Sequence, residues 1–400
     1  MTFRQGLKIT VGCLVNTCLL GACHNEPVKP IKIDDFRRVE IISSGTYAKI
    51  TRTDKHCRVS ISDSTAVLLD AQGEIHIRGN STANCPKRSF LLKLDEDCSV
   101  CGMPVAQSWG LLANYYDKTM LRNSLAFRLS EDSRLQWTPR SQFVELWFNG
   151  EHEGTYQVCE KVQVHPNRIH VPADGWLVEI DARTAETAPQ FRTLEMEQPF
   201  HVLYPENIDS IRLSAIAAYF LEAETALIGE NFTDSIAGWR NYLDEQSWID
   251  WYLINEIAKN ADAIFFSSCF MYSGMDGRIV IGPVWDYDLA FGNTTFNGTD
   301  NPEGWYIRTT GWYVRLFEDP AFAQAVKERF NYFYNRREEY LQFIRSEAFV
   351  LRPHVQANEN IWHTMDKQLW NEPLHSSYDE NTDALIDWLS RRFEWMNGNW

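Results

Sequence analysis

Residues 282–288 read Gly-Pro-Val-Trp-Asp-Tyr-Asp, and they follow a predicted β-hairpin in the second half of the chain. A helix predicted over residues 247–259 precedes that hairpin and leads to Asp262. We expect the return strand of the hairpin to bring Asp286 and Asp288 close to Asp262. Phosphoryl transfer needs one carboxylate that orients the attacking group and another that holds Mg²⁺ on the phosphates. The run therefore predicts a site with the acidic groups of phosphoryl transfer.

Strand patterns dominate the first half of the chain. Asn149-Gly150, placed between two runs of alternating apolar residues, indicates a hairpin turn, and residues 151–154 are expected to lengthen its loop. One helix is predicted over residues 118–131, where apolar residues recur at helical spacing. The predicted strands cover residues 74–78, 89–94, 143–148, 155–161 and 176–181.

Helical patterns dominate the second half. Helices are predicted over residues 210–228, 247–259, 321–349 and 380–396, and a short hairpin pairs residues 269–272 with 278–281. We therefore expect an α+β fold with two lobes and a ligand in the cleft between them. The predicted domains are a strand-rich N-terminal lobe over residues 36–205 and a helical C-terminal lobe over residues 206–400, with a metal-type hairpin over residues 262–293.

The N-terminus has the pattern of an export signal. Residues 1–22 contain Arg4 and Lys8 before an apolar stretch that is too short to span a membrane. The run that ends in Cys23 resembles a bacterial lipobox, whose cysteine is acylated. We expect residues 23–35 to be a tether and the protein to be an exported lipoprotein, anchored in the outer or cell-surface membrane. A plain signal peptide with a chance cysteine is the alternative.

The net charge and the cysteine content indicate which partners and which cross-links to expect. The chain of 400 residues has a net charge of −16, and no run of Lys or Arg suggests a nucleic-acid partner. Six cysteines follow the signal region, and in an exported chain an even number suggests disulfides. Cys98 and Cys101 could instead form half of a zinc site, or some of the six could be buried thiols.

Short motifs occur in a fixed order between Arg78 and Asn293, and together they resemble the CotH spore-coat kinase family. The resemblance implies an atypical, bilobal protein-kinase-like fold. It also implies that ATP and a divalent metal, Mg²⁺ or Mn²⁺, are used to phosphorylate hydroxyl groups of a protein. The motifs are Arg78-Gly79-Asn80-Ser81-Thr82, Lys87-Arg88-Ser89-Phe90, Trp109-Gly110-Leu111-Leu112-Ala113-Asn114, Leu121-Arg122-Asn123, Phe143-Val144-Glu145-Leu146, Gly154-Thr155-Tyr156, Glu160-Lys161 and Trp285-Asp286-Tyr287-Asp288.

The resemblance assigns roles to the acidic and basic residues. Asp262 corresponds to the catalytic aspartate and Asp286 to the metal-binding aspartate. Asp288 would be a second metal ligand or a structural acceptor. Lys161, at the end of a strand, could reach the nucleotide phosphates, although a solvated pair with its neighbour Glu160 is the alternative.

Other residues of the motifs have weaker assignments. Arg78 and Lys87 flank a turn whose backbone donors could bind phosphate, and both could equally be surface charges. Asn255 and Asn260 would orient Asp262 or cap the helix end. Arg122 would be a buried polar link or a ligand contact, and Glu145 is a further supporting residue because it lies within a matching motif.

The sequence departs from the family in one region. Spore-coat members place a metal-binding asparagine about five residues after the catalytic aspartate, whereas this chain has Ser267 and Ser268 there. A hydroxyl is a poorer Mg²⁺ ligand than an amide or carboxylate oxygen, so chemistry with two metal ions is less expected. A glycine-rich loop is also absent before the strand that carries Lys161.

Three functions follow as hypotheses. The first is an ATP- and metal-dependent phosphotransferase that acts on Ser or Thr of a protein, although ATP is scarce outside the cytoplasm. The second is a surface lipoprotein, an adhesin or a glycan-binding module, that retains the cleft without activity; exposed aromatic residues would suit sugar stacking. The third, glycoside hydrolysis by a pair of carboxylates, is supported by the acidic composition alone.

Overall fold

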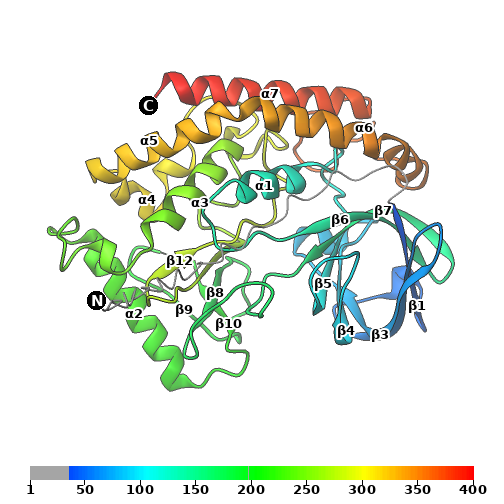
Figure 1. The fold of residues 1–400 in the computed structure, drawn as a ribbon, viewed down its shortest axis with the longest axis horizontal. Helices are drawn as coiled ribbons and strands as arrows, with labels where there is room; N and C mark the ends of the chain where they lie inside the picture. The colour runs from blue at the N-terminus through cyan, green and yellow to red at the C-terminus, as the bar shows by residue number, and fades with distance from the viewer. Residues whose placement is uncertain (1–35, 197) are drawn as a thin grey trace, which may run out of the picture. The chain divides into compact units, whose positions relative to one another are not determined.

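The structure is a computed structural model, and it describes residues 36–196 and 198–400. It has a mixed α+β fold in which a strand-rich N-terminal region is followed by a mainly helical C-terminal region (Figure 1). Cys23 and the predicted segments 1–22 and 23–35 lie outside the described residues. Within the described ranges, no helix has the length and apolar character needed to cross a membrane.

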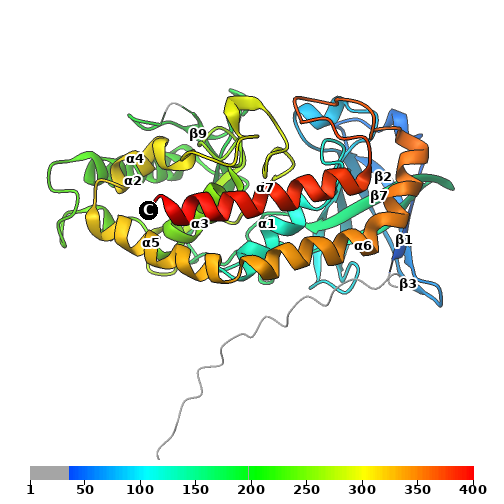
Figure 2. The ribbon, with the colours of Figure 1, turned by 90° about the horizontal axis from the view of Figure 1, so that it is seen from above.

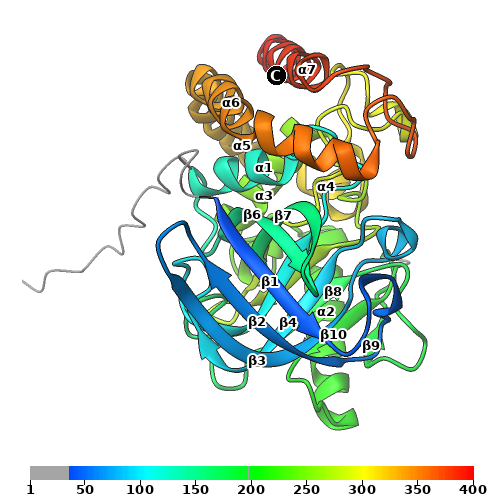
Figure 3. The same cartoon turned by 90° about the vertical axis from the view of Figure 1, so that its right-hand side faces the viewer.

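The N-terminal strands form a closed seven-stranded barrel in the order β1-β2-β3-β4-β5-β7-β6 (Figure 3). Apolar side chains alternate along its strands, so one face of each strand is buried inside the barrel. Val39 and Ile41 pair across β1 and β2 with Ile61 and Val59, and all four are buried. The strands are β1 Arg37–Ser43, β2 Lys55–Ser62, β3 Val67–Ile77, β4 Phe90–Cys98, β5 Ala106–Leu112, β6 Ser141–Phe148 and β7 Glu151–Glu160.

The hairpin between β6 and β7 is closed by Asn149 and Gly150, as predicted. Both residues have positive φ, 49° and 84°, which is the conformation that favours an Asn-Gly turn. The expected lengthening of the loop was wrong, because β7 begins at Glu151 directly after the turn. The irregularity lies within the hairpin instead: Leu146 pairs with Gly154 and Trp147 with His152, so β7 has one more residue than β6 at this point.

A second, five-stranded sheet lies beside the barrel in the order β12-β11-β8-β10-β9 (Figure 1). The predicted boundary between the lobes, at residues 205 and 206, divides this sheet, because three of its strands come before the boundary and two come after it. The strands are β8 Leu177–Ile180, β9 Gln190–Phe191, β10 Phe200–Tyr204, β11 Cys269–Ser273 and β12 Ile279–Ile281.

The helices pack on this sheet and against one another, as Figure 2 shows from above. Helix α3 is buried along almost its whole length, and its Trp248 and Trp251 pack against Tyr313. The helices are α1 Arg122–Glu131, α2 Ser210–Ile228, α3 Glu245–Ala258, α4 Gly311–Leu316, α5 Pro320–Asn335, α6 Arg337–Trp362 and α7 Tyr378–Gly398.

The single helix predicted over residues 321–349 was wrong. The chain forms two helices there, because Arg336 leaves the helical conformation with φ −101° and ψ 4°. Its guanidinium pairs with Asp132, which follows α1, and with Glu339 in the first turn of α6, and these contacts hold the bend. Helix α6 also continues past Pro353 to Trp362, since its later turns bury Val355.

The disulfides expected from the cysteine count are not formed among the described residues. All six cysteines are free thiols. Cys85 lies 3.0 Å from the hydroxyl of Tyr116, and Cys159 and Cys269 are buried in the core on β7 and β11. These cysteines behave as small buried side chains, which is a common role for unpaired cysteine.

Candidate active site

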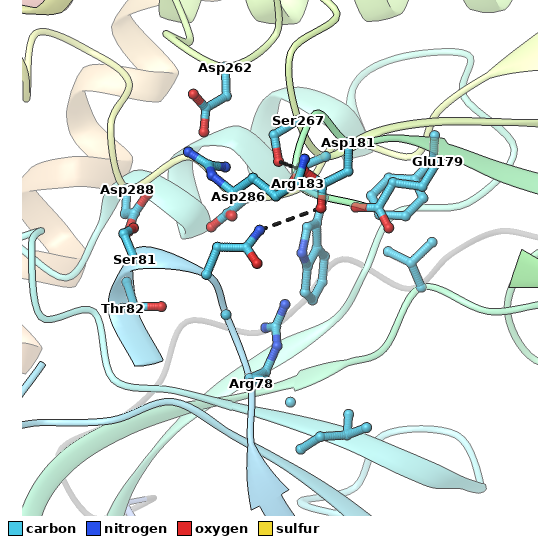
Figure 4. A pocket seen from close by; sticks show the side chains of 18 of the residues that line it. Arg78, Ser81, Thr82, Glu179, Asp181, Arg183, Asp262, Ser267, Asp286 and Asp288 are labelled. Atoms are coloured by element: carbon cyan, nitrogen blue, oxygen red, sulfur yellow. Dashed lines mark hydrogen bonds between the residues drawn. The ribbon is translucent and has the colours of Figure 1, made fainter. Parts of the chain in front are cut away.

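A cavity of about 320 Å³ lies between the barrel and the second sheet. Its walls come from the turn after β3, the ends of β7 and β8, and the loops on both sides of the β11–β12 hairpin (Figure 4). Asp262, Asp286, Asp288, Arg78 and Lys161 all line it. The volume lies within the range of about 300–1,000 Å³ that small-molecule sites occupy.

Asp262 is placed by the end of helix α3. Lys259 adopts the left-handed conformation, φ 42°, and ends the helix with its N–H bonded to the last carbonyls. The amide nitrogen of Asn260 lies 3.4 Å from Oδ1 of Asn255, and its own Oδ1 accepts the backbone N–H of Asp262 at 3.3 Å. The two asparagines therefore help to hold the loop that carries Asp262, which is one of the two roles considered for them.

Asp286 and Asp288 lie on an irregular segment after β12, which ends at Ile281, rather than on the continuing strand we expected. Asp286 has φ 65°, an uncommon conformation for a residue with a side chain. Tyr287 between them is fully buried, and its hydroxyl donates to Oδ1 of Asn255 at 2.7 Å. This bond ties the segment to the end of α3, while both carboxylates face the cavity (Figure 4).

Burial and neighbouring carboxylates raise the pKa values of the acids in the cavity. Burial, followed by the charges of Asp286 and Asp181, raises the pKa of Asp262 to about 6, against the opposing charge of Arg183. Burial also raises the pKa of Asp286, while Arg78, Arg183 and a hydrogen bond from Ser268 oppose the shift. Burial first, and the neighbouring carboxylates second, therefore favour the protonated forms of these acids, and the arginines only partly oppose this.

Asp288 is the most strongly affected of the group. Burial, then the charges of Asp286 and Asp262, raise its pKa well above the usual range of an aspartate. A divalent cation between these oxygens would remove the repulsion and restore the ionised forms.

The carboxylates of the cavity suit a cation that also binds to the phosphates of a substrate. Over residues 36–196 and 198–400, no three His, Cys, Asp or Glu side chains are grouped closely enough to hold a metal ion by themselves. Mg²⁺ is commonly bound by one or two carboxylates together with water and substrate phosphates. Asp286 and Asp288 can provide such carboxylates.

Basic groups line the same cavity. Arg78 stacks over the ring of Trp285 at 5.0 Å, and Lys161 follows directly after β7. Burial lowers the pKa of Lys161, partly offset by the charge of Glu206. Arg183 and Arg52 also line the cavity, and the sequence reasoning missed both. Arg183 could have been noticed because it follows closely on a predicted strand.

Two acids of the cavity were also missed, Glu179 on β8 and Asp181 just after it. Burial, then the charges of Asp181 and Asp286, raise the pKa of Glu179 to about 8. The hydroxyl of Ser267 donates to Oδ1 of Asp181 at 3.1 Å, and the side-chain amide of Asn80 lies 3.4 Å from Oδ2 (Figure 4). A carboxylate therefore sits beside the serine that stands where the family has an asparagine.

Lys87 lies outside the cavity, which corrects the expectation that it contacts a nucleotide there. It is buried, and its ammonium donates to the carbonyls of Ala113 and Thr155 and lies over the ring of Tyr156. Burial lowers the pKa of Lys87 to about 7. Its donors are directed to the protein backbone, so its role is structural.

Glu145 and Arg122 also lie away from the cavity. Glu145 accepts hydrogen bonds from His152 and His354, each at 2.6 Å, and so joins the barrel to helix α6. Arg122 pairs with Asp117 at 2.6 Å and donates to the carbonyl of Ala290 at 3.0 Å. Arg122 therefore supports the segment after Asp288, as the buried polar link considered for it.

Most of the chain, including nearly all of the cavity, matches the model of a known protein family. A protein-family model described as "CotH kinase protein" matches residues 75–396, a range that includes every residue of the cavity named above except Arg52. The comparison with curated proteins gave no match.

Proposed function

Since the chain belongs to the CotH kinase family, we propose that it transfers the γ-phosphoryl group of ATP to Ser or Thr hydroxyls of a protein, with Mg²⁺ or Mn²⁺ as cofactor. One observation supports this most directly. Asp262, Asp286 and Asp288 share a cavity with Arg78, Lys161 and Arg183, so that acids for a cation and bases for phosphates are brought together.

Each group has a proposed part in the reaction. Asp286 and Asp288 would hold the cation, which when bound would neutralise charge on the phosphates. Arg78, Lys161 and Arg183 bind the phosphate oxygens. Asp262 orients the attacking hydroxyl and accepts its proton as the new O–P bond forms and the bond to the β-phosphate oxygen breaks, with the electron pair leaving on ADP. A pKa of about 6 leaves Asp262 mostly ionised at neutral pH, as a base requires.

Asp181 compensates for the missing asparagine in this proposal. Its carboxylate is held by Ser267 in the cavity that Asp286 also lines. Carboxylate oxygens are good ligands for Mg²⁺. A second cation would therefore be held by Asp181, with Ser267 as the residue that positions it.

Export and lipid attachment remain part of the proposal. The sequence pattern at Arg4, Lys8 and Cys23 supports an exported lipoprotein in the outer or cell-surface membrane. Mass spectrometry of the membrane fraction would show an acylated N-terminal Cys23 peptide, and an unmodified or uncleaved N-terminus would contradict this assignment.

Nucleotide binding provides the first test of the function. Thermal unfolding would be followed with and without ATP and Mg²⁺ or Mn²⁺, for the parent protein, Asp286→Ala and the exposed control Asp383→Ala on α7. A ligand at 100 times its dissociation constant stabilises the fold by about 2.7 kcal/mol. We expect a rise in melting temperature for the parent and the control and a lost or much smaller rise for Asp286→Ala. An equal response of all three proteins, or no response of the parent, would contradict the proposal.

A further inference from the structure

The start of β1 lies beside the hairpin that joins β2 and β3, at one end of the barrel (Figure 3). Arg38, near the start of β1, pairs with Ser62 at the end of β2. Val67, at the start of β3, pairs with the same Ser62. The point where the chain enters the barrel and the turn of residues 63–66 therefore lie at the same end.

This end of the barrel exposes apolar side chains. Val67 and Leu68 are 64% and 48% exposed, and Val105, between β4 and β5, is 44% exposed. The guanidinium of Arg37 donates to the carbonyl of Cys101 at 2.6 Å, so the connection that carries Val105 also lies beside the start of β1. We call Val67, Leu68 and Val105 the apolar tip.

The charged groups nearest the apolar tip are bonded within the protein. Oδ1 of Asp63 accepts two backbone N–H groups of its own turn, at 2.7 and 2.9 Å. Nε of Arg58 donates to Oδ1 of Asp70 at 2.7 Å. The exposed residues 95–97, at the end of β4, are all acidic and oppose contact with an anionic surface. This end therefore suits a partner surface that is apolar and carries no net charge.

The predicted lipid attachment point is only a short segment away from this end. Cys23 precedes Phe36 by 36 − 23 = 13 residues. A chain of 13 residues spans at most about 47 Å, at about 3.6 Å for each residue. A contact made by a tethered protein has a high effective concentration, so a small apolar area can be enough to hold it.

We propose that the apolar tip inserts into the surface of a bilayer with neutral head groups, so that this end of the barrel faces the membrane. The inference rests on the proposed acylation of Cys23, and it does not depend on phosphoryl transfer.

This orientation would leave the cavity open to solution. Strand β3 runs from Val67 at the apolar tip to Ile77, and the turn that follows it lines the cavity. At about 3.3 Å for each residue, the two ends of β3 are about 30 Å apart. The cavity would thus be held away from the lipid, where a protein substrate can reach it.

Quenching of a fluorescent label by lipid tests this orientation. The full-length lipidated protein would be reconstituted into phosphatidylcholine vesicles that contain a lipid with a nitroxide near its head group. A bimane label would be attached through Ser64→Cys in the turn beside the tip, or through Ile236→Cys as the control. Ile236 is 85% exposed and follows α2, outside the barrel. Both chains would carry Cys98→Ser, because the other five cysteines of the described residues are buried.

We expect the nitroxide to reduce emission at position 64 at least about twofold more than at position 236, because inserted apolar side chains reach about 5–10 Å into the bilayer surface. Val67→Asn combined with Leu68→Asn should abolish this difference. Since both side chains are exposed, this change should leave the melting temperature of the protein nearly unchanged.

Equal quenching at positions 64 and 236, or quenching at position 64 that persists with the two asparagines, would overturn the inference. Flotation of the vesicles separates this failure from failure of the lipid attachment. A protein that floats with the vesicles without selective quenching would contradict the orientation alone. A protein that does not float would contradict the acylation of Cys23, and the inference with it.

Discussion

Tyr287→Phe tests how much the hydrogen bond between Tyr287 and Asn255 contributes to stability. This bond joins the segment that carries Asp286 and Asp288 to the end of helix α3. The change removes one oxygen, whose proton bonds Oδ1 of Asn255 at 2.7 Å in a fully buried position. It leaves Asn255 with the amide of Asn260 at 3.4 Å as its remaining side-chain donor. A lost buried hydrogen bond costs about 1 kcal/mol, and an unsatisfied acceptor raises the cost to about 1–3 kcal/mol. We therefore expect the free energy of unfolding to fall by about 2 kcal/mol.

Urea unfolding followed by tryptophan fluorescence measures this change, with Tyr219→Phe as the matched control. Tyr219 donates to the carbonyl of Gly277 at 2.8 Å, a bond of similar length at an exposed position. Water can replace that partner, so the control should lose less than about 0.5 kcal/mol. Equal, small losses in both variants would refute the reasoning, because the bond between the loops would then contribute nothing beyond an ordinary surface contact.

Three further predictions follow from burial and charge. The pKa of Asp262 is raised to about 6, so the folded protein keeps its proton at low pH and loses the associated stability as pH rises from about 4 to 6. Asp262→Asn should therefore have a free energy of unfolding about 1–2 kcal/mol higher than that of the parent above pH 6. Urea unfolding at pH 4 should show no such gain. Lys87→Met should retain the stabilisation by ATP and Mg²⁺, because Lys87 lies outside the cavity, whereas Lys161→Met should reduce it; the opposite order in thermal unfolding would contradict the placement of these lysines. Glu372→Gln breaks the buried ion pair between Lys118 and Glu372 and should lower the free energy of unfolding by about 3–5 kcal/mol. A loss below about 1 kcal/mol would show that this ion pair does not form in solution.

The sequence was sufficient to predict the acids that are close together along the chain. Asp262, Asp286 and Asp288 are separated by one short hairpin, so local patterns alone indicate that they meet. The mixed α+β composition and the Asn149-Gly150 turn were also predictable, because strand periodicity and turn chemistry depend on neighbouring residues.

The residues that were missed depend on pairing between distant segments. Asp181 reaches the cavity because β8 pairs with β11, with Ile180 opposite Cys269. Nothing in the local pattern of residues 176–181 specifies that partner. Trp370 reaches the cavity through a buried ion pair between residues 118 and 372, which is equally invisible to periodicity.

The errors have similar causes. Lys87 belongs to a motif with charged neighbours, and only the closed barrel shows that its ammonium is directed to backbone carbonyls. The break at Arg336 contains neither Gly nor Pro, and Asp132, one of the side chains that hold it, comes from a distant part of the chain. In both cases a tertiary contact overrides the preference of the local sequence.

Transfer of labelled γ-phosphate from ATP, compared between the parent and Asp262→Asn, tests the central claim most directly. The protein itself and a synthetic serine-containing peptide would be the acceptors, with Mg²⁺ or Mn²⁺ present and Asp383→Asn as the control. We expect the parent and the control to transfer phosphate and Asp262→Asn to be slower by at least about 100-fold, while ATP still raises its melting temperature. A parent protein that binds ATP but labels neither acceptor, or an Asp262→Asn variant that labels them at the parent's rate, would contradict the assignment of this cavity as a phosphotransferase site.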